Sequence, residues 1–227
     1  MTRQLGVLGG TFDPIHVGHL DAADAARSAL ALDEVLFVPS HDPPHRPMEP
    51  HANAFHRFAL VALAIDNLPG YRVSDVEARR PGSSYTSDTL RALHAAGWRP
   101  SELFFILGTD AFADIATWHE FPGVLDDAHF VIVARPGTAI GGALAGTPEL
   151  RQRVRPLDRA NDRAGRTAIF LVEARTRDVS STTVRARLAA RQPIDDLVPP
   201  AVARHIAAHR LYVESNLHGH SEKVRGT

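Results

Sequence analysis

Two histidines near the N-terminus lie three residues apart in the stretch His16-Val-Gly-His19. Side chains with this spacing lie on one side of a helix. A short apolar run precedes them at residues 5–8, and Gly9 and Gly10 follow that run directly. Glycines let a backbone approach a ligand closely, and the start of a helix offers unpaired N–H groups and partial positive charge. We therefore predict a strand, a glycine turn and a helix start that bind a phosphate beside two imidazoles.

This stretch differs from two common phosphate-binding patterns. The P-loop needs Gly-Lys-Ser or Gly-Lys-Thr at the end of its turn, and the only lysine of the chain is Lys223. The dinucleotide-binding fingerprint needs a third glycine in the register Gly-x-Gly-x-x-Gly, which is missing here. A capped helix with two surface histidines is the alternative reading without a ligand.

A second candidate anion site is the segment Ser180-Ser-Thr-Thr-Val-Arg185. Hydroxyls and free N–H groups at the start of a helix can bind an anion. Arg185 lies about one turn further and can reach the same anion with its planar guanidinium group. Capping the helix would need only one Ser or Thr, so the segment favours phosphate binding, with capping as the alternative.

Apolar runs alternate with helical patterns along the chain. Strands are predicted at residues 5–8, 35–38, 71–76, 103–107, 130–133 and 168–172, and helices at 20–32, 52–67, 86–96, 180–190 and 199–211, with another helix that begins at Gly108. Such alternation implies a parallel sheet with right-handed crossovers. We predict an α/β fold, a Rossmann-like doubly wound parallel sheet of five to six strands with helices on both faces. A single domain would span residues 1–215, with a surface excursion at 138–165 and a disordered polar tail at 216–227.

The composition narrows the classes of protein to consider. The chain has 227 residues, of which 44% are hydrophobic and 22% charged, and a formal net charge of −1. So small a net charge gives no overall attraction to nucleic acids or membrane surfaces, and no apolar run approaches the roughly 18–20 residues that span a bilayer. Cysteine is absent, which excludes disulfides, thiol nucleophiles and thiolate metal ligands. We expect a cytoplasmic protein without nucleic-acid or membrane partners, and a homo-oligomer stays open.

Four segments in order carry a resemblance to a known family. Residues 9–19 resemble the His-x-Gly-His signature of the nucleotidyltransferase superfamily, and residues 179–185 resemble its Ile-Ser-Ser-Thr-x-x-Arg motif. Residues 77–90, with their Ser-Tyr-Thr-x-Asp-Thr-Leu block, are similar to nicotinate-nucleotide adenylyltransferases. Residues 105–119, with Gly-Thr-Asp-Ala and Trp-His, are similar to the same branch. The resemblance covers roughly residues 6–187.

The resemblance implies direct transfer of the adenylyl group of ATP to nicotinate mononucleotide in NAD biosynthesis, which gives deamido-NAD and pyrophosphate, with Mg²⁺ accompanying ATP. It implies catalytic roles for His16, His19 and Arg185. The ATP-binding residues that it implies are Gly9, Gly10, Thr11, Phe12, Gly18, Gly108, Asp110, Ser180, Ser181, Thr182 and Arg185. The residues that it implies for nicotinate mononucleotide are Asp13, Arg46, Tyr85, Thr86, Trp118 and Arg135.

Some alternatives stay open at this point. Arg46 stands where the family usually has a lysine, which keeps the charge and changes its reach. His41, His45 and His51 could be read as metal ligands, but without cysteines or a neighbouring carboxylate pair we predict no metal-binding residues. Another enzyme of the same fold, such as a phosphopantetheine adenylyltransferase, and a non-catalytic nucleotide-sensing module are the alternative functions. The preference for nicotinate over nicotinamide mononucleotide rests on the resemblance alone.

Overall fold

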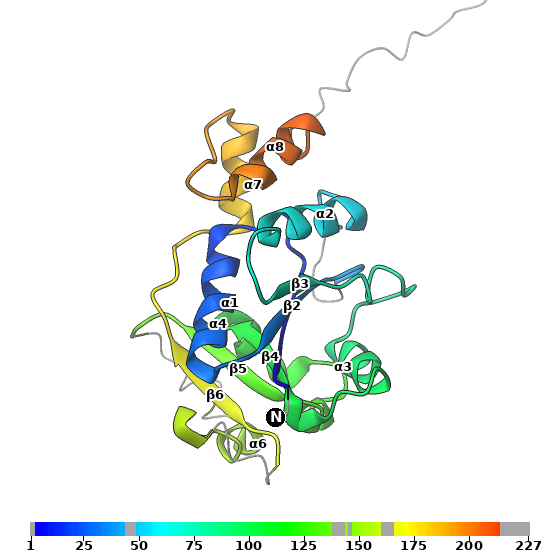
Figure 1. Cartoon of the computed structure of the whole chain (residues 1–227), viewed down its shortest axis with the longest axis vertical. Coiled ribbons are helices and arrows are strands. Elements are labelled where there is room, and N and C mark those ends of the chain that lie inside the picture. Colours follow the sequence, from blue (N-terminus) through cyan, green and yellow to red (C-terminus); the bar gives the residue numbers. More distant parts are fainter. Residues whose placement is uncertain (1–2, 44–48, 138–143, 145–146, 160–165, 214–227) are drawn as a thin grey trace, which may run out of the picture.

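The computed structural model describes residues 3–43, 49–137, 144, 147–159 and 166–213. Its centre is a six-stranded sheet in which every strand is parallel to its neighbours, in the order β3-β2-β1-β4-β5-β6 (Figure 1). The strands are β1 (Leu5–Gly10), β2 (Glu34–Pro39), β3 (Tyr71–Val73), β4 (Leu103–Gly108), β5 (His129–Ala134) and β6 (Ile169–Glu173). The predicted α/β fold with a parallel sheet is confirmed.

Helices cover both faces of the sheet. They are α1 (Val17–Leu30), α2 (Ala54–Ile65), α3 (Thr86–Ala95), α4 (Thr109–Ala113), α6 (Pro148–Arg151), α7 (Ser181–Ala189) and α8 (Pro200–Ala208). Successive side chains of a strand point to opposite faces. Phe104 of β4 accordingly belongs to a core with α1, α2 and α8, whereas Phe105 belongs to a second core with α3 and α4. The sheet is therefore doubly wound, as predicted.

The two glycines of the first strand correct one expectation. Gly9 and Gly10 are predicted to form a turn, but they lie inside β1 and pair with Val38 and Pro39 of β2. A Cβ atom on Gly9 would lie 3.2 Å from the ring of Phe105, and a Cβ atom on Gly10 would lie 3.1 Å from the ring of Phe12. Glycine is needed here because two aromatic rings pack against the strand, and the turn begins only after Gly10.

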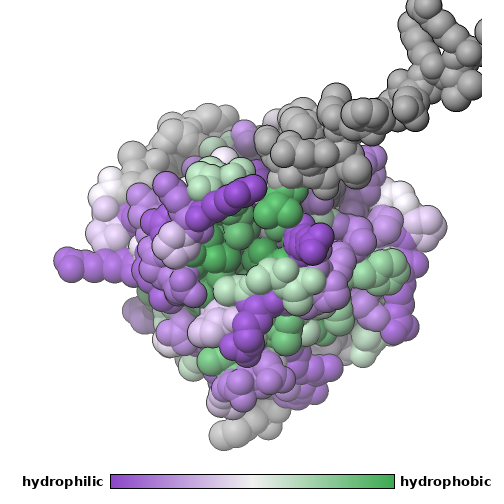
Figure 2. Space-filling model, turned by 90° about the horizontal axis from the view of Figure 1, so that it is seen from above, coloured by the Kyte–Doolittle hydropathy of each residue, from purple (hydrophilic) through white to green (hydrophobic). Residues whose placement is uncertain are grey.

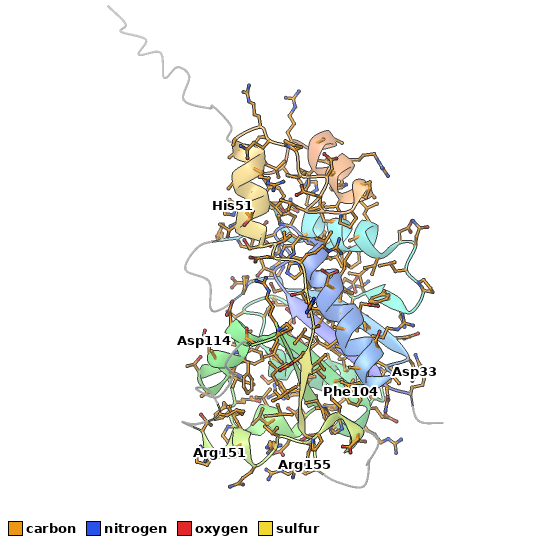
Figure 3. The ribbon with its side chains drawn as sticks, turned by 90° about the vertical axis from the view of Figure 1, so that its left-hand side faces the viewer. Asp33, His51, Phe104, Asp114, Arg151 and Arg155 are labelled. Atoms are coloured by element: carbon orange, nitrogen blue, oxygen red, sulfur yellow. The ribbon has the colours of Figure 1, made fainter. Side chains whose placement is uncertain are left out.

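The described part of the predicted surface excursion contains the short helix α6. The buried Arg153 fastens this segment to the chain just before β5 and just before β6, since its guanidinium group donates to the carbonyl of Leu125 and the hydroxyl of Thr167 at 2.8 and 3.1 Å. In Figure 3, Arg151 and Arg155 lie at the opposite end of the molecule from His51. The excursion is therefore remote from the end that carries α7 and α8.

Two elements end three residues earlier than predicted. Strand β3 ends at Val73, and α8 ends at Ala208. After α8, Arg210 and Tyr212 have positive φ angles of 51° and 63°, which a continuing helix cannot accommodate. Within the part of the chain that the structure describes, no helix combines the length and apolar character needed to cross a membrane. The predicted tail at 216–227 lies outside the described residues.

Candidate active site

The strand order reverses next to β1, because β2 and β3 extend the sheet on one side of it and β4, β5 and β6 on the other. In doubly wound sheets, ligands bind beyond the carboxyl ends of the strands at such a switch point. Strand β1 ends at Gly10 and its neighbour β4 ends at Gly108. The predicted phosphate-binding stretch thus follows a strand at the position where the topology favours a ligand.

A cavity of about 260 Å³ lies at this place. Its lining residues are Gly9, Gly10, Thr11, Ser40, Pro43, Glu77, Ser84, Thr86, Phe105, Leu107, Ala111 and Trp118. Seen from the end that carries α7 and α8, the molecule has hydrophobic residues at the centre of the face and hydrophilic residues around them (Figure 2). The cavity brings the predicted ATP-binding residues of β1 together with two residues predicted for the mononucleotide, Thr86 and Trp118.

The two histidines begin helix α1. His16 is the N-cap residue, its backbone N–H donates to Nδ1 of His19 at 3.2 Å, and the two rings stack with centroids 3.7 Å apart. Burial lowers the pKa of His16 to about 4, although the charge of Asp21 acts in the opposite direction. His16 is therefore neutral at pH 7. Its Nδ1 is buried and turned toward Gly18 and the start of α1, so a ligand would meet the other ring nitrogen.

Gly18 lies between the two histidines in the sequence, and little space is free beside its Cα atom. A Cβ atom there would lie 3.2 Å from the carbonyl oxygen of Arg177 and 3.2 Å from Nδ1 of His16. A larger residue would push against both the backbone before α7 and the first histidine. The glycine of the motif thus permits the close approach of two segments that are far apart in the sequence.

The hydroxyl residues at the start of α7 contact the loop that follows β1. Ser180 caps α7 by accepting the backbone N–H of Thr183 at 3.0 Å. Ser181 donates to the carbonyl oxygen of Pro14 at 2.9 Å. Arg185 donates to the carbonyl oxygen of Asp13 at 2.7 Å and to the hydroxyl of Thr182 at 3.2 Å. Capping therefore accounts for part of the segment only, and the rest holds α7 against the loop between β1 and α1.

The carboxylate of Asp13 is completely buried and engaged by protein groups. It accepts the backbone N–H groups of His51 and Ala52 at 2.9 and 3.0 Å, and Nδ1 of His51 lies 3.2 Å away. Burial acts to raise the pKa of Asp13, but these hydrogen bonds and the nearby hydroxyl of Tyr212 outweigh it and hold the pKa below 3.8. Asp13 thus anchors the loop from within, and its predicted contact with the mononucleotide stays a prediction.

The other predicted residues for the mononucleotide lie around α3 and after α4. Tyr85 is the N-cap of α3 and stacks on His119 with ring centroids 4.3 Å apart. Trp118 is half-buried and meets Phe105 edge to face at 5.9 Å. Arg135 is not among the residues that line the cavity. Its exposed side chain pairs with Asp178 at 2.8 Å.

The remaining predicted residues are exposed or lie outside the described residues. Gly108 and Asp110 are exposed at the end of β4, where Gly108 is the N-cap of α4. Arg46 and His45 lie outside the described residues, so the predicted phosphate contact of Arg46 stays a prediction. Among the described side chains, no group of three or more His, Cys, Asp or Glu residues is arranged to hold a metal ion.

Comparison with known proteins identifies the family. Residues 7–187 match the model of the cytidylyltransferase-like family. The chain is 42% identical over 212 residues to a protein of Trichlorobacter lovleyi named "Probable nicotinate-nucleotide adenylyltransferase", covering 92% of this chain and 99% of that protein. A protein of the same name from Symbiobacterium thermophilum is 41% identical over 218 residues, with coverages of 95% and 98%. The chain belongs to the nicotinate-nucleotide adenylyltransferase family.

A solved structure shares the fold of this adenylyltransferase family member. It is the nicotinic acid mononucleotide adenylyltransferase of Plasmodium falciparum complexed with NaAD, with a TM-score of 0.70 and 19% identity. The match covers 92% of this chain and 97% of that one. The resemblance predicted from the four motifs is thereby confirmed at the level of family and fold.

One buried residue that the sequence did not predict organises the site. Arg57 of α2 is 1% exposed, and its guanidinium group donates to four backbone carbonyl oxygens. These belong to Thr11, Ser40, His41 and Ala52, at 2.9, 2.5, 3.1 and 3.0 Å. Arg57 therefore ties the loop after β1 to the loop after β2. The available signal was its place on the apolar face of α2, three residues before Leu60 and four before Val61.

Proposed function

We propose that the chain transfers the adenylyl group of ATP to nicotinate mononucleotide, which gives deamido-NAD and pyrophosphate. The observation that carries the proposal is the cavity at the switch point of the sheet. It joins the glycine-rich end of β1 to Thr86 and Trp118. The residues proposed to bind phosphate and the residues suited to a flat ring therefore line the same cavity.

The chemistry demands positioning more than proton transfer. The 5′-phosphate of the mononucleotide is already an anion at neutral pH, so it can attack the α-phosphorus of ATP without a strong base. A new P–O bond forms to the α-phosphorus while its bond to the bridging oxygen of pyrophosphate breaks, and the leaving group carries the electron pair. Catalysis then consists of alignment and stabilisation of charge on the phosphate oxygens.

The described residues are suited to these tasks. Neutral His16 can donate a hydrogen bond to a phosphate oxygen through the ring nitrogen that does not face the start of α1. We assign stabilisation of the α-phosphate to His19, on the same side of the helix start. Backbone donors at the end of β1 would hold the phosphates, and Ser180, Ser181 and Arg185 the departing pyrophosphate.

Mg²⁺ would enter with ATP as part of the substrate. The phosphates and water would supply most of its ligands, because the described side chains offer no group of three His, Cys, Asp or Glu arranged around a common point. The ion would reduce the negative charge of the triphosphate. Positioning the nucleotide would remain the task of the protein groups named above.

The acceptor side of the cavity fits a pyridine ring that bears a carboxylate. Trp118 offers a flat aromatic face for stacking, and the start of α3 at Thr86 offers backbone N–H groups and partial positive charge to an anion. Because the amide form of the mononucleotide has the same flat ring, only the second feature separates acid from amide. We propose that the reaction takes place in the cytoplasm and within a single domain of residues 1–215.

The test is pyrophosphate release by the purified protein with ATP and Mg²⁺. Nicotinate and nicotinamide mononucleotides and phosphopantetheine are supplied side by side. A strong preference for nicotinate mononucleotide is the expected result. Equal rates with the two mononucleotides would refute the proposed recognition of the carboxylate. Release with phosphopantetheine alone would refute the acceptor, and no release with any acceptor would favour a nucleotide-sensing module.

A further inference from the structure

A buried carboxylic acid lines the cavity proposed for the pyridine ring. Glu77 is 6% exposed, and it is the only ionisable side chain among the described residues that line this cavity. The other lining groups are glycines, hydroxyl residues, a proline and apolar or aromatic side chains. A negative group is unexpected at the place where a carboxylate substrate is proposed to bind.

Two hydroxyl groups fix the orientation of this carboxyl group. Thr89 of α3 donates to Oε1 of Glu77 at 2.5 Å. The hydroxyl oxygen of Ser84 accepts the backbone N–H groups of His41 and Asp42 at 2.9 and 3.3 Å, and this hydroxyl group also acts to lower the pKa of Glu77. Glu77 is thus connected both to the first turn of α3 and to the loop after β2.

The electrostatic balance at Glu77 responds to a nearby cation. Burial raises the pKa of Glu77, while the two hydroxyl groups and the charges of Arg80 and Arg57 act against this effect. A positive group that enters the cavity would favour the ionised form, because an opposite charge within a few ångströms stabilises it. The ionised form of Glu77 is therefore stabilised when a cation enters the cavity.

The proposed substrate supplies this cation. The ring nitrogen of an oxidised pyridine mononucleotide is quaternary, so the ring carries a full positive charge in the acid and the amide form alike. The reduced form is a neutral dihydropyridine of nearly the same size. Trp118 lines the same cavity and adds an aromatic face, which also attracts a cation.

We propose that Glu77 determines specificity by recognising the positive charge of the pyridinium ring, so that the enzyme selects oxidised over reduced mononucleotides. This inference rests on the proposed function and concerns the acceptor side of its site. Within that site, the start of α3 would recognise the carboxylate and Glu77 the ring charge. The two groups would act on different parts of one zwitterionic base.

The test compares oxidised and reduced nicotinamide mononucleotide as competitors of nicotinate mononucleotide, for the wild type and for Glu77→Gln. Glutamine keeps an acceptor for Thr89 and removes the charge. We expect the wild type to bind the oxidised form about ten-fold more tightly, and Glu77→Gln to lose most of this difference. The KM for nicotinate mononucleotide should rise by a similar factor, while the KM for ATP and kcat change little.

Thr89→Val is the matched control for a merely structural role. It removes the hydroxyl that orients Glu77 and keeps the carboxylate, so it should retain the preference for the oxidised form. Unchanged discrimination in Glu77→Gln overturns the inference, and so does equal affinity of the wild type for the two forms, whether or not the variant folds. No pyrophosphate release by the wild type would instead overturn the proposed function and the inference with it.

Discussion

Two buried histidines make this protein sensitive to mild acid, and His129 offers the clearest test. His129 begins β5, is 5% exposed and stacks on Phe104 with ring centroids 4.7 Å apart. Its Nδ1 accepts the backbone N–H of Ala168 at 3.0 Å, which requires that this nitrogen carries no proton. Burial lowers the pKa of His129 to about 4, against a smaller raising effect from a backbone hydrogen bond at Ser101.

The magnitude follows from the displacement of the pKa. For His129 and His16 the pKa falls from the ordinary value of 6.5 to about 4 on folding. Each unit corresponds to about 1.36 kcal/mol, so each histidine carries roughly 3 kcal/mol of pH-dependent stability. The loss from both together is comparable with the whole free energy of unfolding of a typical domain, about 5–15 kcal/mol.

The direction follows from where protons bind. Above pH 6.5 the imidazoles are neutral in the folded and the unfolded chain, and this stability is fully present. As the pH falls from 6.5 toward 4, the unfolded chain takes up protons that the folded chain excludes, and the free energy of unfolding decreases. Glu77 offsets a part of this loss, because burial raises its pKa. The pKa of Asp13 is lowered, so its contribution is lost only below pH 3.8.

Denaturant unfolding between pH 7 and pH 4 measures this effect. The wild type should lose stability steeply, and His129→Gln should lose roughly 3 kcal/mol less over the full range from pH 6.5 to 4. Glutamine can keep an acceptor for the N–H of Ala168. The exposed His41 supplies the matched control, His41→Gln, which should follow the wild type. Equal pH dependence in the wild type and His129→Gln would show that protonation of His129 does not destabilise the fold.

Three substitutions test the residues around the phosphate-binding loop. His19→Ala should lower kcat by about 100-fold or more in a folded protein. His19→Asn can still accept the N–H of His16 and should stay impaired. Normal activity of His19→Asn would mean that the imidazole ring only caps α1. Arg57→Lys should lower the free energy of unfolding by about 2–4 kcal/mol, because an ammonium group cannot reach four carbonyls, and an unchanged denaturation midpoint would contradict this.

Strands β2, β4 and β5 could be predicted from the sequence because each is buried and consists almost entirely of a continuous apolar run. The error at Gly9 and Gly10 has a physical cause. A turn and a strand packed under an aromatic ring both require glycine, and only the fold shows that Phe105 and Phe12 lie against these positions. A local pattern cannot separate the two explanations, since the rings come from β4 and from beyond the strand itself.

Candidate site residues could be predicted where several polar residues stand close together in the sequence, as in residues 16–19 and 180–185. Arg57 could not, because its partners are backbone carbonyls, which leave no trace in the sequence. Glu77 belongs to a segment that the sequence singled out, but its position in the cavity depends on contacts formed on folding, such as the hydrogen bond from Thr89 of α3. Tyr212 reaches Asp13 only because the chain turns back after α8 through two residues with positive φ.

These remote contacts converge on one loop, between β1 and α1. Arg57 holds the carbonyl of Thr11, Arg185 that of Asp13, and Ser181 that of Pro14. The backbone N–H of Val17 donates to the carbonyl of Leu197 at 2.9 Å, which fastens the start of α1 as well. A reaction that depends on alignment needs its phosphate-binding backbone fixed before the substrate arrives. The residues nearest the phosphates therefore explain only part of the site. The other part is the set of hydrogen-bond partners that keep this loop in place, namely donors from α2 and α7 and the carbonyl of Leu197 before α8.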